Sequence, residues 1–195
     1  TAVNSADRAT MIGLAAVLFM IGSYLVFYGS MGAEHDLFPL LFLVFAIPVP
    51  VPIMEKIVGG LVAGSVFLTG LLFDGLSVPF VKEGAIFHLP GFSIEVAQEC
   101  SSIRSSLALF ITSVLAGHLF LKRFWTKALL SSFAVPVAVF KNAVRIVTLT
   151  LLSGFVDMRI LRGGFLHKSG GFVFFGIGLV VMAIILFIMK EIEGR

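Results

Sequence analysis

The long apolar runs of this chain limit its fold more than any other feature. From Gly170 to Met189 there is no charged side chain, and similar runs recur along the 195 residues with short polar interruptions. A run of about 20 apolar residues can cross a bilayer as a helix. Because 58% of the residues are hydrophobic and only 13% are charged, a soluble domain of this length could not cover its apolar surface. The sequence therefore predicts an all-α integral membrane protein, folded as a polytopic helical bundle.

We expect about six transmembrane helices in a single transmembrane domain, residues 1–195. The second run carries Pro48, Pro50 and Pro52, and we expect it to end there because each proline removes a helical donor. Glu55 and Lys56 would form the link that follows. The six expected spans are Met11–Gly29, Leu37–Met54, Ile57–Leu76, Cys100–Leu121, Ala128–Leu152 and Gly170–Met189.

A polar segment, residues 77–99, separates the third span from the fourth. Glu83-Gly84 and Pro90-Gly91 are turn signals between short apolar runs. We expect a small β-hairpin element that lies on one membrane surface, because the segment is too polar for the bilayer core. Its expected strands are Val78–Lys82, Ala85–Leu89 and Phe92–Ala97.

The distribution of basic residues predicts the orientation in the cell (inner, cytoplasmic) membrane. The tightest basic cluster, Lys122, Arg123 and Lys127, falls inside when both termini are cytoplasmic. The hairpin, the start of the fourth span and the link 156–169 then share the outer face. The net charge of +3 is spread between apolar runs, which argues against nucleic acid as a partner.

The only cysteine, Cys100, lies in the stretch E-V-A-Q-E-C-S-S-I-R-S-S, which opens the fourth span. Arg104 follows it on the same helical face. A thiol at a helix start beside an arginine favours the thiolate, the nucleophilic form. The alternative is that Cys100 is a small buried filler.

A second stretch, F-K-N-A-V-R-I, places Lys141, Asn142 and Arg145 inside the fifth span. An arginine there costs roughly 3 kcal/mol on insertion scales, so it normally faces the protein interior with a partner or a task. If the helix ends near Leu152, Arg145 lies ~10 Å below the outer end, within reach of Cys100.

Arg145 also has a structural alternative, in which it snorkels to the interface or pairs with Glu95 or Glu99.

The third stretch, L-H-K-S-G-G, puts His167 just before the sixth span. Histidine is the usual acid or base near neutral pH, although an ordinary loop histidine is the alternative. No metal-ligand spacing and no nucleotide-binding loop occurs, so we expect no metal and no cofactor.

At these three stretches the chain resembles the exosortase/archaeosortase family of membrane transpeptidases. The resemblance covers about Pro48 to the C-terminus, and Ser102 departs from it where the family commonly has glycine. The motifs that carry it are L-P-G…V-A-Q-E-C-S-S-I-R-S-S (Leu89 to Ser106), K-N-A-V-R-I-V (Lys141 to Val147) and F-L-H-K-S-G-G (Phe165 to Gly171).

The resemblance implies a catalytic set of Cys100, Arg145 and His167. Its implied substrates are exported proteins with a C-terminal sorting signal, which consists of a short motif, a hydrophobic helix and a basic tail. Cys100 would form a thioacyl intermediate, Arg145 or less favourably Arg104 would stabilise the oxyanion, and His167 would transfer protons. The new C-terminus would pass to an amine on a lipid or envelope component. Further supporting residues would be Lys141, Asn142 and Glu99.

Three other functions stay open on the sequence. Lys141 and Arg145 could bind an anion in a transporter or channel. The same catalytic residues could serve a purely hydrolytic cysteine protease at the membrane interface, with water as the acceptor. A non-catalytic assembly factor would tolerate alanine at all three catalytic positions.

Overall fold

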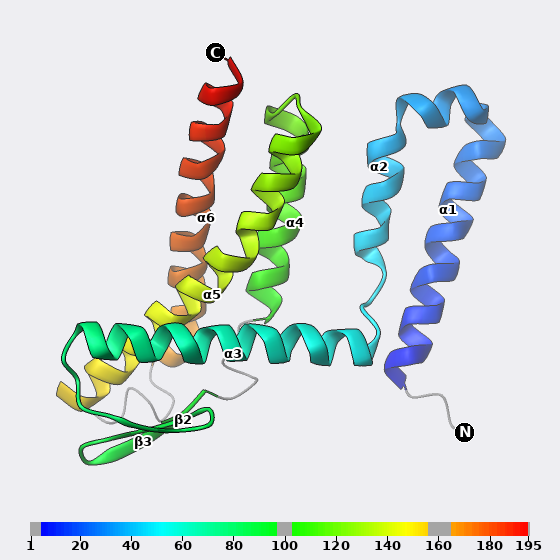
Figure 1. The fold of residues 1–195 in the computed structure, drawn as a ribbon. Coiled ribbons are helices and arrows are strands. Elements are labelled where there is room, and N and C mark those ends of the chain that lie inside the picture. The colour runs from blue at the N-terminus through cyan, green and yellow to red at the C-terminus, as the bar shows by residue number, and fades with distance from the viewer. Residues whose placement is uncertain (1–4, 97–102, 156–164, 195) are drawn as a thin grey trace. The chain divides into compact units, whose positions relative to one another are not determined.

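A computed structural model of the chain describes residues 5–96, 103–155 and 165–194. It separates into two compact units, Thr1–Ile57 and Val58–Arg195, which we describe one at a time (Figure 1). Within the described ranges, five helices are long and apolar enough to cross a membrane. The helical membrane fold predicted from the sequence is confirmed, and the single-domain organisation stays a prediction.

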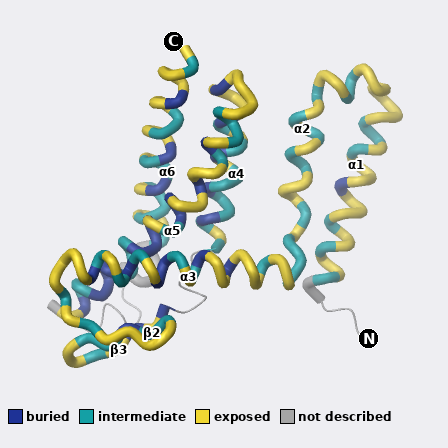
Figure 2. The backbone as a smooth tube through the Cα atoms, viewed as in Figure 1, coloured by how far each residue is buried: buried dark blue, intermediate teal, exposed yellow. Residues whose placement is uncertain are grey.

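The first unit begins with α1 (Ser5–His35), which bends at Gly29, where φ is 70°. It continues with the short helix α2 (Leu37–Phe42) and the 3₁₀ turn η1 (Leu43–Ala46). Most of α1 and α2 is exposed (Figure 2). These exposed side chains are largely apolar, as expected for helices that face hydrocarbon.

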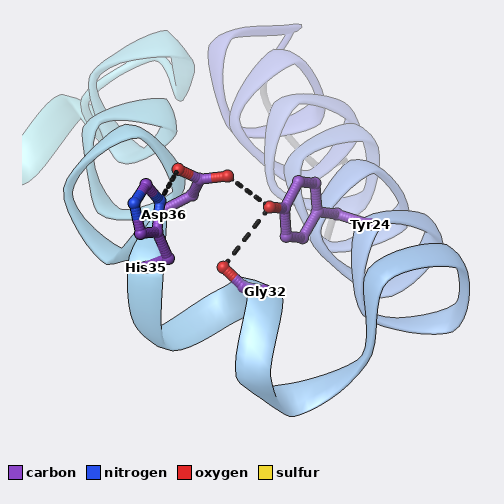
Figure 3. Close-up of polar contacts among 4 residues, drawn as sticks. All are labelled: Tyr24, Gly32, His35 and Asp36. Atoms are coloured by element: carbon purple, nitrogen blue, oxygen red, sulfur yellow. Dashed lines mark hydrogen bonds and ion pairs between the residues drawn. The ribbon is translucent and has the colours of Figure 1, made fainter.

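A polar cluster closes the turn between α1 and α2 (Figure 3). The Tyr24 hydroxyl donates to the Asp36 carboxylate and also lies 3.4 Å from the carbonyl of Gly32. His35 Nδ1 lies 3.0 Å from the other carboxylate oxygen of Asp36. The hydrogen bond from Tyr24, and secondly that from His35, lowers the pKa of Asp36 below its ordinary value.

The second unit contains most of α3 (Val51–Gly75), three strands, and the helices α4 (Ile103–Phe120), α5 (Phe124–Phe155) and α6 (Phe165–Gly194). Helix α5 packs against both α4 and α6, and α4 also contacts α6 (Figure 1). Their shared core is apolar and includes Leu109, Leu130, Ala134, Ala138 and Met182.

The strands β1 (Val81–Glu83), β2 (Ile86–Leu89) and β3 (Phe92–Glu95) form an antiparallel sheet in chain order. Turns at Gly84 and Gly91 connect them, both with positive φ, which glycine adopts without strain. One face of the sheet packs on α3 and on the C-terminal part of α5 through a buried cluster of Val66, Phe73, Phe87, Ile94 and Val147.

The three expected strands are therefore confirmed, with bounds shifted by a few residues. The second span was expected at Leu37–Met54, but the helix stops at Ala46, before Pro48. It is a short apolar helix, Leu37–Ala46. Pro50 and Pro52 instead lie just before and within the first turn of α3, where a missing N–H costs no helical hydrogen bond. The expected link at Glu55 and Lys56 is wrong, because both residues lie inside α3.

Candidate functional site

Among the described residues of the second unit, Lys141 is the most deeply buried charged residue, with 3% of its surface exposed. Its Nζ donates a 2.6 Å hydrogen bond to Ser105 Oγ in the first turn of α4. Its aliphatic chain runs past α6 at Gly178, where an added Cβ would lie 3.1 Å from Lys141 Cδ. The side chain thus joins α5, α4 and α6, and a larger residue at 178 would require Lys141 to shift by a few tenths of an ångström.

Asn142 connects α5 to α3. Its Nδ2 donates a 3.0 Å hydrogen bond to Ser65 Oγ, and both residues are buried. Within the described part of the chain, three buried oxygens have no hydrogen-bond partner, on Asn142, Ser106 and Thr69. A buried polar atom without a hydrogen bond lowers the stability of the fold, so these three groups reduce the free energy of unfolding.

Arg145 lies one helical turn beyond Lys141, or about 6 Å along the α5 axis, and is half-buried. Because α5 continues to Phe155 rather than ending near Leu152, Arg145 lies about 15 Å from the helix end, deeper than the sequence suggested. Arg104 is exposed in the first turn of α4. The structure therefore brings Lys141, Asn142 and Arg145 together on α5 and leaves Arg104 at the surface.

Cys100 and Glu99 lie outside the described residues. In the sequence, Cys100 precedes Ile103, where α4 begins, by three residues.

His167 lies in the first turn of α6, so the expectation that it precedes the helix in a link is wrong. Its side chain is outside the described part of the structure. Along α6, its backbone precedes Gly178 by about 16 Å. Gly178 lies beside Lys141, so both distances can be measured from that level. His167 is then about 10 Å nearer than Arg145 to the end of the bundle where the sheet packs.

Three helices have an end at the same end of the bundle. Helix α4 begins, α5 ends and α6 begins at the end where the sheet packs (Figure 1). This arrangement follows from three consecutive antiparallel helices and holds whatever the number of spans before α4. The number of earlier spans decides only which membrane face this end occupies.

A cavity of about 260 Å³ lies between α4, α5 and α6, starting one turn beyond Ser105. Apolar side chains dominate its lining, among them Leu109, Leu179 and Met182. It extends away from the sheet end of the bundle. Among the described residues, no group of three or more histidine, cysteine, aspartate or glutamate side chains could hold a metal ion.

Sequence reasoning missed the partners of the two polar residues on α5. Ser105 was visible only as one of several serines near Cys100, and Ser65 and Gly178 carried no signal that linked them to Asn142 or Lys141. Their roles arise from contacts between helices, which spacing along one helix does not reveal.

Comparison with known proteins identifies the family. The family model described as transmembrane exosortase (Exosortase_EpsH) matches residues 2–184. No curated protein and no solved structure gives a match. The matched region includes all three motif stretches and nearly all of the described helices. The chain therefore belongs to the transmembrane exosortase family.

Proposed function

We propose that this protein is a membrane cysteine transpeptidase that cleaves a C-terminal sorting signal and transfers the new C-terminus to an amine. Membership of the exosortase family is the observation that carries this proposal. The arrangement of α4, α5 and α6 supports it, because Arg145 and His167 lie on packed helices and Cys100 precedes the first residue of α4 by three residues in the sequence.

In the proposed reaction the Cys100 thiolate attacks the carbonyl carbon of the scissile peptide bond. Arg145 donates hydrogen bonds to the oxyanion that develops, a contribution of ~3 kcal/mol for one positioned donor. His167 protonates the amine that leaves, and the acyl group stays on Cys100 as a thioester. An incoming amine then gives up a proton to His167, attacks the thioester and releases the thiolate.

The axial spacing of the residues suits a substrate lying between them. Arg145 and the first turn of α6 are separated by about 10 Å along the bundle, and Cys100 comes three residues before α4 in the sequence. An extended peptide rises about 3.3 Å per residue, so a short motif covers this distance. Lys141 and Asn142 would fix the position of α5 against α4 and α3. Glu99, next to Cys100 in the sequence, would be a supporting residue of the site.

The proposed substrates are exported proteins whose signal combines a motif, a hydrophobic helix and a basic tail. The protein would lie in the cytoplasmic (inner) membrane with both termini in the cytoplasm and the sheet end of the bundle outside. There a substrate anchored by its own helix presents its motif to Cys100. The acceptor would be a lipid or an envelope component with a free amine.

The anion-transport alternative receives less support. Lys141 Nζ is held by Ser105 rather than facing an open path. Beyond Lys141 toward the start of α5, the buried side chains are apolar, among them Leu130, Ala134 and Val137. A conducting path for anions needs polar or charged groups along its length.

The test is a processing assay with an exported reporter that carries candidate C-terminal signals. The product is weighed for the wild type, Cys100→Ala, Arg145→Lys and His167→Ala. Each substitution should lower processing at least about 10²-fold, Arg145→Lys included, because a point charge does not replace the planar guanidinium. A product with added acceptor mass indicates transpeptidation, whereas a free carboxylate indicates hydrolysis.

Two control variants match these changes at the opposite end of the bundle. His118→Ala and Arg123→Lys alter exposed residues near the end of α4 and the start of α5, and both should process the reporter like the wild type. Wild-type processing by Cys100→Ala would refute the proposed chemistry, and an assembly factor would then account better for the chain.

A further inference from the structure

The contact between Lys141 and Ser105 has a geometry that the proposed cysteine chemistry does not use. Lys141 is almost fully buried, its Nζ lies 2.6 Å from the Ser105 hydroxyl, and Ser105 itself is partly accessible. No carboxylate among the described residues forms an ion pair with Lys141. A buried lysine beside a serine hydroxyl is the arrangement in which the amine activates a serine nucleophile.

The surroundings of Ser105 supply a further requirement of such a site, which is room for an acyl chain. The apolar cavity begins at Leu109, one helical turn from Ser105, and continues along Thr112, Leu179 and Met182. A carbonyl at Ser105 could therefore carry an apolar chain that runs into this cavity.

We propose that Ser105 and Lys141 form a second nucleophilic site, a serine–lysine dyad that takes acyl esters whose hydrocarbon chain occupies the cavity between α4, α5 and α6. The cavity lining contains no charged side chain, which favours a hydrocarbon chain over a charged peptide. Its nucleophile is Ser105 rather than Cys100, so a test in the Cys100→Ala protein separates it from the proposed transpeptidase activity.

The reaction balances with water as the only co-reactant. The neutral amine of Lys141 accepts the proton of the Ser105 hydroxyl while Oγ bonds to the acyl carbon. The bond from that carbon to the ester oxygen breaks, and the Lys141 ammonium returns the proton to the leaving alcohol. Water then attacks the Ser105 ester with Lys141 as the base, which releases the carboxylic acid and restores the serine.

The test uses the full chain in detergent micelles with Cys100→Ala, so that the thiol cannot contribute. An alkyl fluorophosphonate should add one covalent group to Ser105, detected by intact mass and peptide mapping. Ser105→Ala, Lys141→Met and Lys141→Arg should each lower the labelling rate at least about 10²-fold. Lys141→Arg keeps the positive charge, so its failure would separate the base from a merely structural cation.

A matched control is Ser131→Ala, which removes another partly buried serine of a membrane helix, one that donates 3.0 Å to the carbonyl of Lys127. It should be labelled like its parent. The cavity is tested with p-nitrophenyl octanoate and acetate. Ala183→Phe should lower octanoate turnover about tenfold or more while acetate turnover stays within twofold, because Ala183 lines the cavity away from Ser105.

Three results would overturn the proposal. The first is the absence of any adduct in the Cys100→Ala protein while the wild type still processes sorting signals, which would leave the transpeptidase standing. The second is labelling that persists in Ser105→Ala. The third is competition by sorting-signal peptides without hydrolysis of octanoate, which would make the cavity a peptide site.

Discussion

Removal of the Phe87 side chain should release the sheet from the helices. Phe87 is fully buried in the face that β2 turns toward α3. Its ring centroid lies 5.6 Å from that of Phe73 and 5.4 Å from that of Phe80. Truncation of a buried phenylalanine to alanine costs ~3–5 kcal/mol. The sheet has few other buried side chains, so most of this cost should appear as local opening.

Trypsin cleavage after Lys82 measures this opening, because Lys82 lies in β1 and a paired strand must separate before it is cut. When opening is fast compared with cleavage, the cleavage rate follows the open population. A loss of 3 kcal/mol raises that population at least about 10²-fold. Phe87→Ala should therefore be cut at least about 10²-fold faster than the wild type.

The matched control is Val81→Ala, on the same strand as the cleavage site. Val81 is 63% exposed, so its truncation should change the cleavage rate by no more than about twofold. Equal cleavage rates for Phe87→Ala, Val81→Ala and the wild type would refute the packing argument. Because β3 leads to Cys100, the same Phe87→Ala protein should also process sorting signals more slowly.

Three further predictions concern polar contacts. Ser65→Ala removes the acceptor of a buried Asn142 amide, so it should lower the free energy of unfolding by about 1–3 kcal/mol in a denaturant titration; no change would contradict the role of this hydrogen bond. The Glu193 carboxylate at the end of α6 accepts hydrogen bonds from two backbone N–H groups in the turn before α5. Glu193→Ala should therefore lower the melting temperature. An unchanged melting temperature would show that these bonds do not anchor the end of α6. Tyr24→Phe removes a hydrogen bond to Asp36, so it should lower the melting temperature of the first unit at pH values above the ordinary pKa of Asp36, about 3.8. The difference from the wild type should vanish as the pH falls through the lowered pKa of Asp36 in the native state. A pH-independent difference in melting temperature would contradict the hydrogen-bond explanation.

The sequence predicted the membrane class and the sheet because both depend on local pattern. Long apolar runs are long helices in α1, α5 and α6, and glycine turns at Gly84 and Gly91 separate the strands. Proline was a less certain guide. Pro48 follows the end of a helix, whereas Pro136 lies inside α5, where the helix continues. A helix in lipid tolerates proline when neighbouring groups satisfy the freed carbonyl, and that depends on tertiary packing.

The site was predictable in its residues and less so in its contacts. Lys141, Asn142 and Arg145 stood out because charged and amide groups are costly within a membrane helix. The partners of Lys141 and Asn142 lie on α4 and α3, and pairing between helices leaves no periodic trace in one sequence. Likewise, the true length of α5 places Arg145 about 5 Å deeper than its distance from Leu152 suggested, because the helix continues to Phe155.

The most direct test of the central claim is the detection of an acyl group on Cys100. Wild-type protein is incubated with a sorting-signal peptide, quenched in acid and measured by intact mass, alongside Cys100→Ala and Cys100→Ser. We expect a substrate-derived adduct on the wild type that hydroxylamine removes as a thioester, and no adduct on Cys100→Ala. Cys100→Ser should form either no adduct or an oxygen ester that resists mild hydroxylamine. Processing of the peptide by Cys100→Ala at the wild-type rate, with no adduct on either protein, would contradict the assignment of Cys100 as the nucleophile.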